Sequence, residues 1–117
     1  KPAIKRIASL RELNVGQTIM FHYPEESDHC ILIRLPGRES DANGAGLVAY
    51  SQKCTHLSCA VIPDVENGVI HCPCHEGFFD LKTGVVLAGP PPRPLPRILL
   101  ELRGDDVYAT GIERRTV

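Results

Sequence analysis

Short apolar stretches alternate with polar, turn-forming stretches along almost the whole chain. No segment keeps a helical spacing of apolar residues over three turns, so helices are not expected to build the core. Residues of high β-propensity are frequent in the apolar stretches. The predicted strands cover residues 7–10, 18–23, 30–35, 47–51, 60–62, 69–71, 78–81, 84–87, 98–102 and 107–110. Gly, Pro, Asn and Asp separate them. The pattern predicts an all-β protein built as an antiparallel sandwich or a small barrel.

Length and charge narrow the range of functions. At 117 residues the chain is long enough for one domain, residues 1–117, with one modest core. The formal net charge is −1 and Trp is absent, so no basic or base-stacking surface is evident. Nucleic acid is therefore not an expected partner. No apolar run approaches the roughly 20 residues that a membrane span needs.

Two short loops carry cysteine and histidine in a spacing that suits a metal centre. The first loop has Cys54 and His56 as C-x-H, and the second has Cys72 and His75 as C-x-x-H. Two thiols and two imidazoles are the ligand set of a Rieske [2Fe–2S] centre, in which histidines replace both thiolates on one iron. The same set also binds zinc. However, C-x-H is a poor fit to the usual zinc spacing of two cysteines.

These paired loops resemble those of the Rieske iron–sulfur proteins, in particular the disulfide-containing branch found in quinol:cytochrome c oxidoreductases. The resemblance runs from about Val48 to the C-terminus. It implies layered antiparallel sheets, with a small cluster-binding insertion at about residues 52–96. It also implies that Cys54 and Cys72 hold the inner iron, with His56 and His75 on the outer one. The histidine at the position of His75 meets the quinol in this family.

The remaining cysteines fit the same resemblance. Cys59 and Cys74 occupy equivalent positions, one per loop, and the resemblance implies a disulfide between them. Two reduced thiols are the alternative, because the ferredoxins of ring-hydroxylating dioxygenases lack this bridge. A structural disulfide favours the oxidising, extracytoplasmic side of a membrane. Cys30 is left over, and its apolar neighbours predict a buried, inert thiol.

The surroundings of the cluster are predicted from further matches. Leu57 would form part of an apolar docking tip. The stretch 89–96, with Pro90 and Pro91, resembles the proline loop that covers the cluster in this family, and fixed backbone angles suit proline to a rigid cover. An extended linker or an adaptor-binding segment is the alternative. Arg93 and Arg97 are possible docking contacts for an electron acceptor.

One departure from the family bears on the redox potential. High-potential members carry Ser and Tyr in the second loop, where their hydroxyls donate hydrogen bonds to cluster and cysteine sulfur. This chain has Gly77 and Phe79 at those positions, so both hydroxyls are missing, and Glu76 adds negative charge. Hydrogen bonds around a cluster tune its potential. A lower potential is therefore expected, which suits a menaquinol-type donor.

Together, the motifs predict an electron-transfer domain that is not catalytic alone. It would accept an electron and a coupled proton from a quinol and pass the electron to a c-type cytochrome, with cytochrome b as a partner subunit. Such subunits carry a membrane anchor, which is expected to be missing from this stretch; a naturally soluble relative is the alternative. Three other functions stay open: the small subunit of a molybdenum oxidase such as arsenite oxidase, a soluble Rieske ferredoxin, and a zinc-stabilised binding module.

Overall fold

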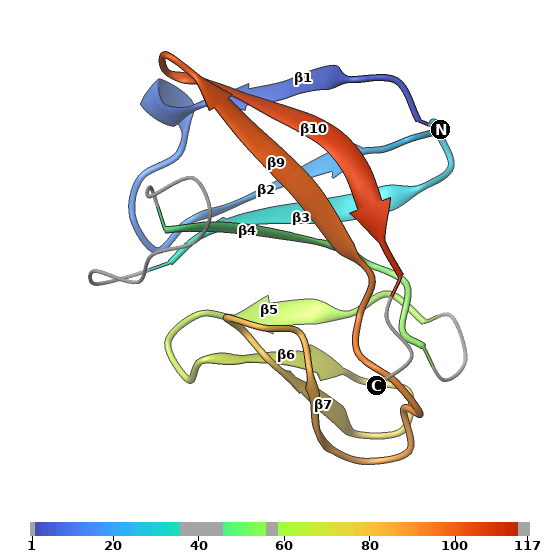
Figure 1. Cartoon of the computed structure of the whole chain (residues 1–117). Helices are drawn as coiled ribbons and strands as arrows, with labels where there is room; N and C mark the ends of the chain where they lie inside the picture. Colours follow the sequence, from blue (N-terminus) through green and yellow to red (C-terminus); the bar gives the residue numbers. More distant parts are fainter. Residues whose placement is uncertain (1, 36–45, 56–58, 115–117) are drawn as a thin grey trace.

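Two antiparallel sheets, one of six strands and one of four, make up the fold (Figure 1). The computed structural model describes residues 2–35, 46–55 and 59–114. The large sheet has the order β1-β10-β9-β4-β3-β2. Its strands are β1 (Lys5–Ser9), β2 (Thr18–His22), β3 (His29–Arg34), β4 (Leu47–Ser51), β9 (Arg97–Arg103) and β10 (Asp106–Glu113). The small sheet has the order β5-β6-β7-β8, with β5 (Ile62–Asp64), β6 (Val69–Cys72), β7 (Gly77–Asp80) and β8 (Val86–Ala88). The all-β prediction of layered antiparallel sheets is confirmed.

Strand β3 is buried on both faces and separates two hydrophobic clusters. Ile31 and Ile33 belong to the cluster that also contains residues of the small sheet, while Cys30 and Leu32 belong to the cluster inside the large sheet. Successive side chains of a strand point to opposite faces. A strand with a core on each side therefore reads as a continuous apolar run, which is what the sequence has at residues 30–33.

The large sheet curls so that its two edge strands approach each other. Strands β1 and β2 are at opposite ends of the sheet order. Even so, the Nζ of Lys5 on β1 donates a hydrogen bond of 2.7 Å to the carbonyl oxygen of His22 on β2. The structure thus combines the two architectures expected from sequence: a curled sheet that encloses one core, and a second sheet layered on its outer face.

Most strand boundaries differ from the sequence prediction by one to a few residues, and three of the differences have a local structural reason. The first strand ends at Ser9, whose side chain begins a short 3-10 helix (Leu10–Glu12) through a capping box with Glu12. Strand β5 runs through Pro63, which the sequence suggested as its end. It is the edge strand of the small sheet, where the missing N–H of proline is tolerated. Strand β8 begins later than expected, because Gly84 at φ +77° is part of the preceding turn.

The small sheet is placed in the sequence between β4 and β9, two strands of the large sheet that pair at Tyr50 and Arg97. This is the place where the cluster-binding insertion over about residues 52–96 is predicted. The boundaries of that unit stay a prediction. Among the residues that the structure describes, no helix is long and apolar enough to cross a membrane.

Candidate metal centre

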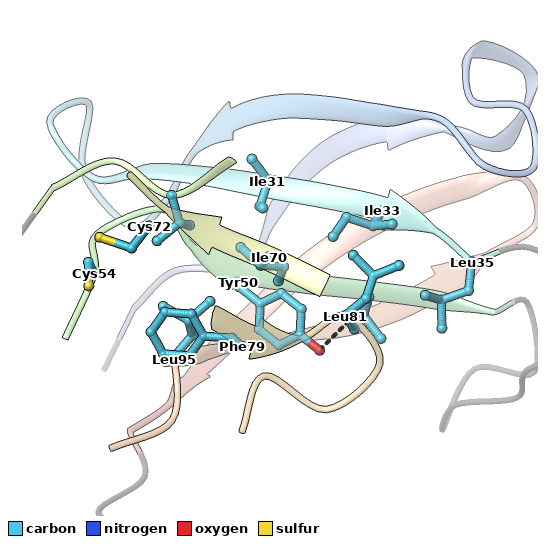
Figure 2. Packing of buried hydrophobic residues seen from close by; sticks show 12 residues of the cluster. Ile31, Ile33, Leu35, Tyr50, Cys54, Ile70, Cys72, Phe79, Leu81 and Leu95 are labelled. Carbon is cyan, nitrogen blue, oxygen red and sulfur yellow. Dashed lines mark hydrogen bonds between the residues drawn. The ribbon is translucent and has the colours of Figure 1, made fainter. Parts of the chain in front are cut away.

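The two cysteines predicted as ligands lie together at one end of the core between the sheets. Cys54 follows β4 by three residues, and Cys72 is the last residue of β6. Their side chains belong to the same hydrophobic cluster, with 2% and 3% of their surface exposed. Figure 2 shows both at the same end of this cluster. Neither takes part in a disulfide. Two buried thiols from separate chain segments are suitable donors for an iron shielded from water.

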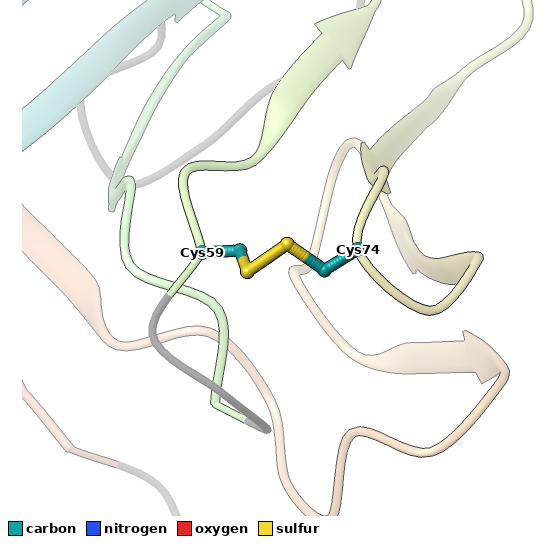
Figure 3. Close-up of a disulfide and its surroundings, with 2 residues drawn as sticks. All are labelled: Cys59 and Cys74. Atoms are coloured by element: carbon teal, nitrogen blue, oxygen red, sulfur yellow. A yellow bond between two sulfur atoms is a disulfide. The ribbon is translucent and has the colours of Figure 1, made fainter.

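A disulfide joins the two loops that carry these cysteines. Cys59 and Cys74 are bonded, with an S–S distance of 1.97 Å and a Cα–Cα distance of 6.4 Å (Figure 3). The first loop is also closed on itself, because the backbone N–H of Cys54 donates to the carbonyl of Cys59 at 2.8 Å. The predicted disulfide is confirmed. It fixes the first loop directly to the second.

Only one of the two predicted histidine ligands lies within the described residues. His75 is exposed at the tip of the second loop, next to the disulfide. His56 and the predicted docking residue Leu57 lie outside the described residues. Within the described ranges, no group of three or more His, Cys, Asp or Glu side chains is placed to hold a metal ion. The assignment of all four ligands therefore stays a prediction from the motif.

The turn after His75 is held by a left-handed residue and a side-chain hydrogen bond. Glu76 has a φ of +55°, which is uncommon for a residue with a side chain. Its carboxylate lies 3.3 Å from Nε2 of His71, and the His71 ring stacks on Phe78 with the centroids 4.7 Å apart. His71 therefore has a structural role in this turn. The sequence carried no signal for the positive φ of Glu76.

The proline-rich stretch packs directly on both loops. A Cβ added to Gly77 would lie 2.7 Å from Cγ of Pro91, so these residues are in close contact. On the other side, the hydroxyl of Thr55 donates to the carbonyl of Arg93 at 2.7 Å. Pro91 is buried, whereas Pro90 is exposed. These contacts are those of a packed segment and argue against an extended linker; its role as a cover for the cluster stays a prediction.

The absence of the two hydroxyls is built into the packing. Gly77 has no room for a side chain beside Pro91. Phe79 is fully buried in the cluster that contains Cys54 and Cys72. The nearby buried hydroxyl of Tyr50 donates to the carbonyl of Leu81 at 3.0 Å (Figure 2). That hydroxyl is engaged with the backbone and is not a substitute for the missing pair.

The leftover thiol of Cys30 is buried in the other core, as predicted. It donates to the carbonyl oxygen of Tyr23 at 3.3 Å. Burial raises the pKa of this thiol from its ordinary value of 9.0 to about 11. A thiolate is the reactive form of cysteine. Cys30 is therefore expected to be unreactive at neutral pH.

The raised pKa of Cys30 predicts a loss of stability in alkali. The folded state holds this proton more tightly than the unfolded state, so the contribution is complete below pH 9 and disappears as the pH rises from 9 to about 11. The loss amounts to at most roughly 2–3 kcal/mol. Denaturant titrations of wild type and Cys30→Ala at pH 8 and pH 10.5 measure it. Equal losses in both proteins would contradict the prediction.

The chemistry of the described donors fits an iron–sulfur centre. Two cysteines are kept out of the disulfide and buried in one hydrophobic cluster, and the other two join the loops that hold them. Zinc would leave this division of the four cysteines unexplained. An all-β domain with such a site fits the class of small iron–sulfur electron-transfer proteins. Comparisons with known proteins identify the family.

Residues 7–99 match the Rieske [2Fe-2S] domain family. The chain is 36% identical over 118 residues to the iodate reductase subunit IdrB of Denitromonas iodatirespirans, which covers 96% of this chain and 63% of that protein. It is 38% identical over 77 residues to the cytochrome bc1 complex Rieske iron-sulfur subunit of Streptomyces lividans, covering 64% of this chain and 45% of that one. Among solved structures, the soluble domain of Rieske protein II (soxF) from Sulfolobus acidocaldarius has the same fold, with a TM-score of 0.81, 23% identity, and coverage of 95% and 78%.

The chain belongs to the Rieske [2Fe-2S] domain family. Its cofactor is a [2Fe–2S] cluster with two cysteine and two histidine ligands, and the domain serves in electron transfer. The chain spans less than two thirds of the length of the iodate reductase subunits.

Proposed function

We propose that the domain accepts an electron and a coupled proton from a quinol and passes the electron to a c-type cytochrome. The contrast between the two ends of the site carries the proposal: Cys54 and Cys72 are buried, and His75 is exposed. When bound, the cluster supplies a one-electron carrier. Cys54 and Cys72 would hold it in the dry core, whereas His56 and His75 would hold its outer side.

The exposed histidine gives the proposal its chemistry. An imidazole that binds metal through one nitrogen can hold or release a proton at the other. His75 is exposed at the surface, where a quinol could meet it. The disulfide and the contact between Gly77 and Pro91 keep this loop in one arrangement. A rigid, exposed imidazole is well suited to bind a donor that must lose a proton together with its electron.

The partners follow from the same proposal. The relatives include the Rieske subunit of a cytochrome bc1 complex, which supports cytochrome b and a c-type cytochrome as partners. The disulfide supports an extracytoplasmic location. Purification of the native protein from its source membranes, followed by haem spectra and metal analysis, tests the assignment. Co-purifying b- and c-type haems are expected.

A second candidate is an electron-transfer subunit of an oxyanion-converting enzyme, related to the molybdenum oxidases. It is favoured by the identity of 36% with the iodate reductase subunit, which extends over 96% of this chain. The same purification separates the two candidates. Molybdenum in the complex, with no cytochrome b, would support this candidate and contradict the first.

The missing hydroxyls give a prediction for the redox potential. The Phe79→Tyr variant should have a higher midpoint potential than the wild type, because a hydroxyl next to the cysteine sulfur stabilises the reduced cluster. One net hydrogen bond of about 1 kcal/mol corresponds to roughly 40 mV for one electron. Redox titration followed by electron paramagnetic resonance measures the shift.

The control for this prediction is Phe21→Tyr, in the core on the far side of β3. It adds the same hydroxyl to a buried ring without approaching either predicted cysteine ligand. Its midpoint potential should equal that of the wild type. An unchanged or lower potential in Phe79→Tyr would contradict the argument from the hydroxyls and weaken the case for a menaquinol-type donor.

A further inference from the structure

A groove of about 790 Å³ runs beside the first ligand loop. Its walls come from the β2–β3 loop, the segment after β4, the proline-rich stretch and the ends of β9 and β10. Cys54 and Thr55 are part of the wall. A molecule seated in this groove would contact the backbone that carries a predicted cluster ligand.

Three cationic side chains from distant parts of the sequence line this groove: Lys53, Arg93 and Arg114. All three are exposed, and within the described part of the chain none of them forms an ion pair. The arginines that do pair with a carboxylate are located elsewhere. They are Arg6 with Asp106, Arg11 with Asp105, Arg97 with Glu113, and Arg103 with Glu101. The charges of these three side chains are therefore not neutralised by an ion pair, on a chain whose net charge is −1.

Among the lining residues that the structure describes, the one carboxylate is Asp28. It is engaged within its own loop, where it accepts a hydrogen bond of 3.1 Å from the backbone N–H of Glu25. Three cations against one carboxylate leave an excess of two positive charges. His29 also lines the groove.

The remaining lining is suited to a polypeptide. Met20 has 64% of its surface exposed and is a flexible apolar contact, and Pro24 and Pro96 add rigid apolar surface. The volume is in the range of pockets that enclose organic ligands and is much larger than a single inorganic anion needs. The cations come from three separate elements and do not converge on one buried point. This distribution favours an extended acidic chain over a small anion.

We propose that this groove binds an acidic segment of the electron-transfer partner, an inference that rests on the proposed function. Carboxylates of the partner would pair with Lys53, Arg93 and Arg114, while its backbone lies against the apolar lining of Met20, Pro24 and Pro96. Complementary charge raises the rate of encounter and fixes orientation. The hydrogen bond between Thr55 and Arg93 links the binding surface to the loop of Cys54. The groove, whose lining does not include His75, would thus bring the partner to the flank of the site.

A fluorescein-labelled octa-glutamate peptide, titrated with the cluster-loaded protein at low ionic strength, tests the proposal by fluorescence anisotropy. The groove variant is Lys53→Gln/Arg93→Gln/Arg114→Gln. The matched control is Arg6→Gln/Arg11→Gln/Arg103→Gln, which makes the same change in net charge at ion-paired positions. We expect affinity to fall about tenfold or more in the groove variant, and to stay within about twofold of wild type in the control. Equal losses in both variants, or no loss in either, would overturn the proposal.

Further measurements distinguish an acidic polypeptide from other anionic ligands, and a failed groove proposal from a variant that does not fold. Binding of inorganic phosphate and of vesicles of anionic phospholipid is measured with the same variants. The choice of an acidic polypeptide would be overturned if either of these ligands binds as tightly as the peptide or more tightly, and depends on the same three cations. If the triple variant does not fold, Arg93→Gln/Arg114→Gln against Arg6→Gln/Arg11→Gln gives the same comparison. The paramagnetic resonance spectrum of each protein is recorded in parallel. Absence of a Rieske signal in the wild type would count against the cluster, and absence of co-purifying b- and c-type haems against the proposed function, whereas peptide binding tests the groove alone.

Discussion

Replacing Gly89 by alanine is expected to lower the free energy of unfolding by about 3 kcal/mol or more, the largest effect of any glycine substitution considered. Gly89 has a φ of +90°, and a Cβ placed there would lie 2.7 Å from Cα of Gly77 and 2.8 Å from the carbonyl oxygen of Glu76. Both contacts are with backbone, which cannot move aside as a flexible side chain does. The proline-rich stretch must therefore separate from the second loop.

The matched control for this variant is Gly16→Ala. Gly16 has nearly the same φ, +87°, but a Cβ there meets nothing within 4 Å. The Gly16→Ala variant has the conformational cost of an alanine in the left-handed region, about 1–2 kcal/mol, but no steric clash. Denaturant titration of the two variants gives the difference. A loss in Gly89→Ala no greater than in Gly16→Ala would show that the stretch is not packed against the second loop.

Removal of the disulfide is expected to cost about 3 kcal/mol of stability, the value for a loop of about 15 residues. Cys59 and Cys74 are separated by 15 residues, and the bond joins the two loops that carry the predicted ligands. The Cys59→Ser/Cys74→Ser variant should therefore unfold at lower denaturant and lose its visible absorbance faster at 37 °C. The loops are then joined mainly through the proline-rich stretch, which contacts both of them.

The decay of visible absorbance reports retention of the cluster separately from the free energy of unfolding. Cys30→Ala removes a buried thiol from the other core and leaves the disulfide intact, so it controls for the loss of cysteine as such. Its absorbance should decay at the wild-type rate. If the double serine variant keeps both its stability and its absorbance at wild-type levels, the disulfide has no role in holding the loops.

Much of the fold could be predicted because local signals and tertiary demands agree. The apolar run at residues 30–35 could only be a strand or a short buried segment, and it is β3 between two cores. Where tertiary context overrides a local rule, the prediction missed. Pro63 normally ends a strand, yet it is accepted within β5 because β5 is an edge.

The site likewise has features that the sequence predicted and features that only the structure shows. The resemblance carried by the paired loops implied the disulfide Cys59–Cys74, which the structure contains, and it named Cys54 and Cys72 as ligands, which the structure buries in one hydrophobic cluster. The close contact between Gly77 and Pro91, and the groove lined by Lys53, Arg93 and Arg114, depend on residues far apart in the chain. No local pattern encodes which distant surfaces meet, so these features required the three-dimensional structure.

The most direct test of the central claim is electron paramagnetic resonance of the reduced protein, with iron analysis, for wild type and single cysteine variants. We predict a Rieske signal and two irons per chain in the wild type and in Cys30→Ala. The signal should be lost in Cys54→Ala and in Cys72→Ala. Bound zinc with no signal, or a Rieske signal that survives the loss of Cys54 or Cys72, would contradict the account.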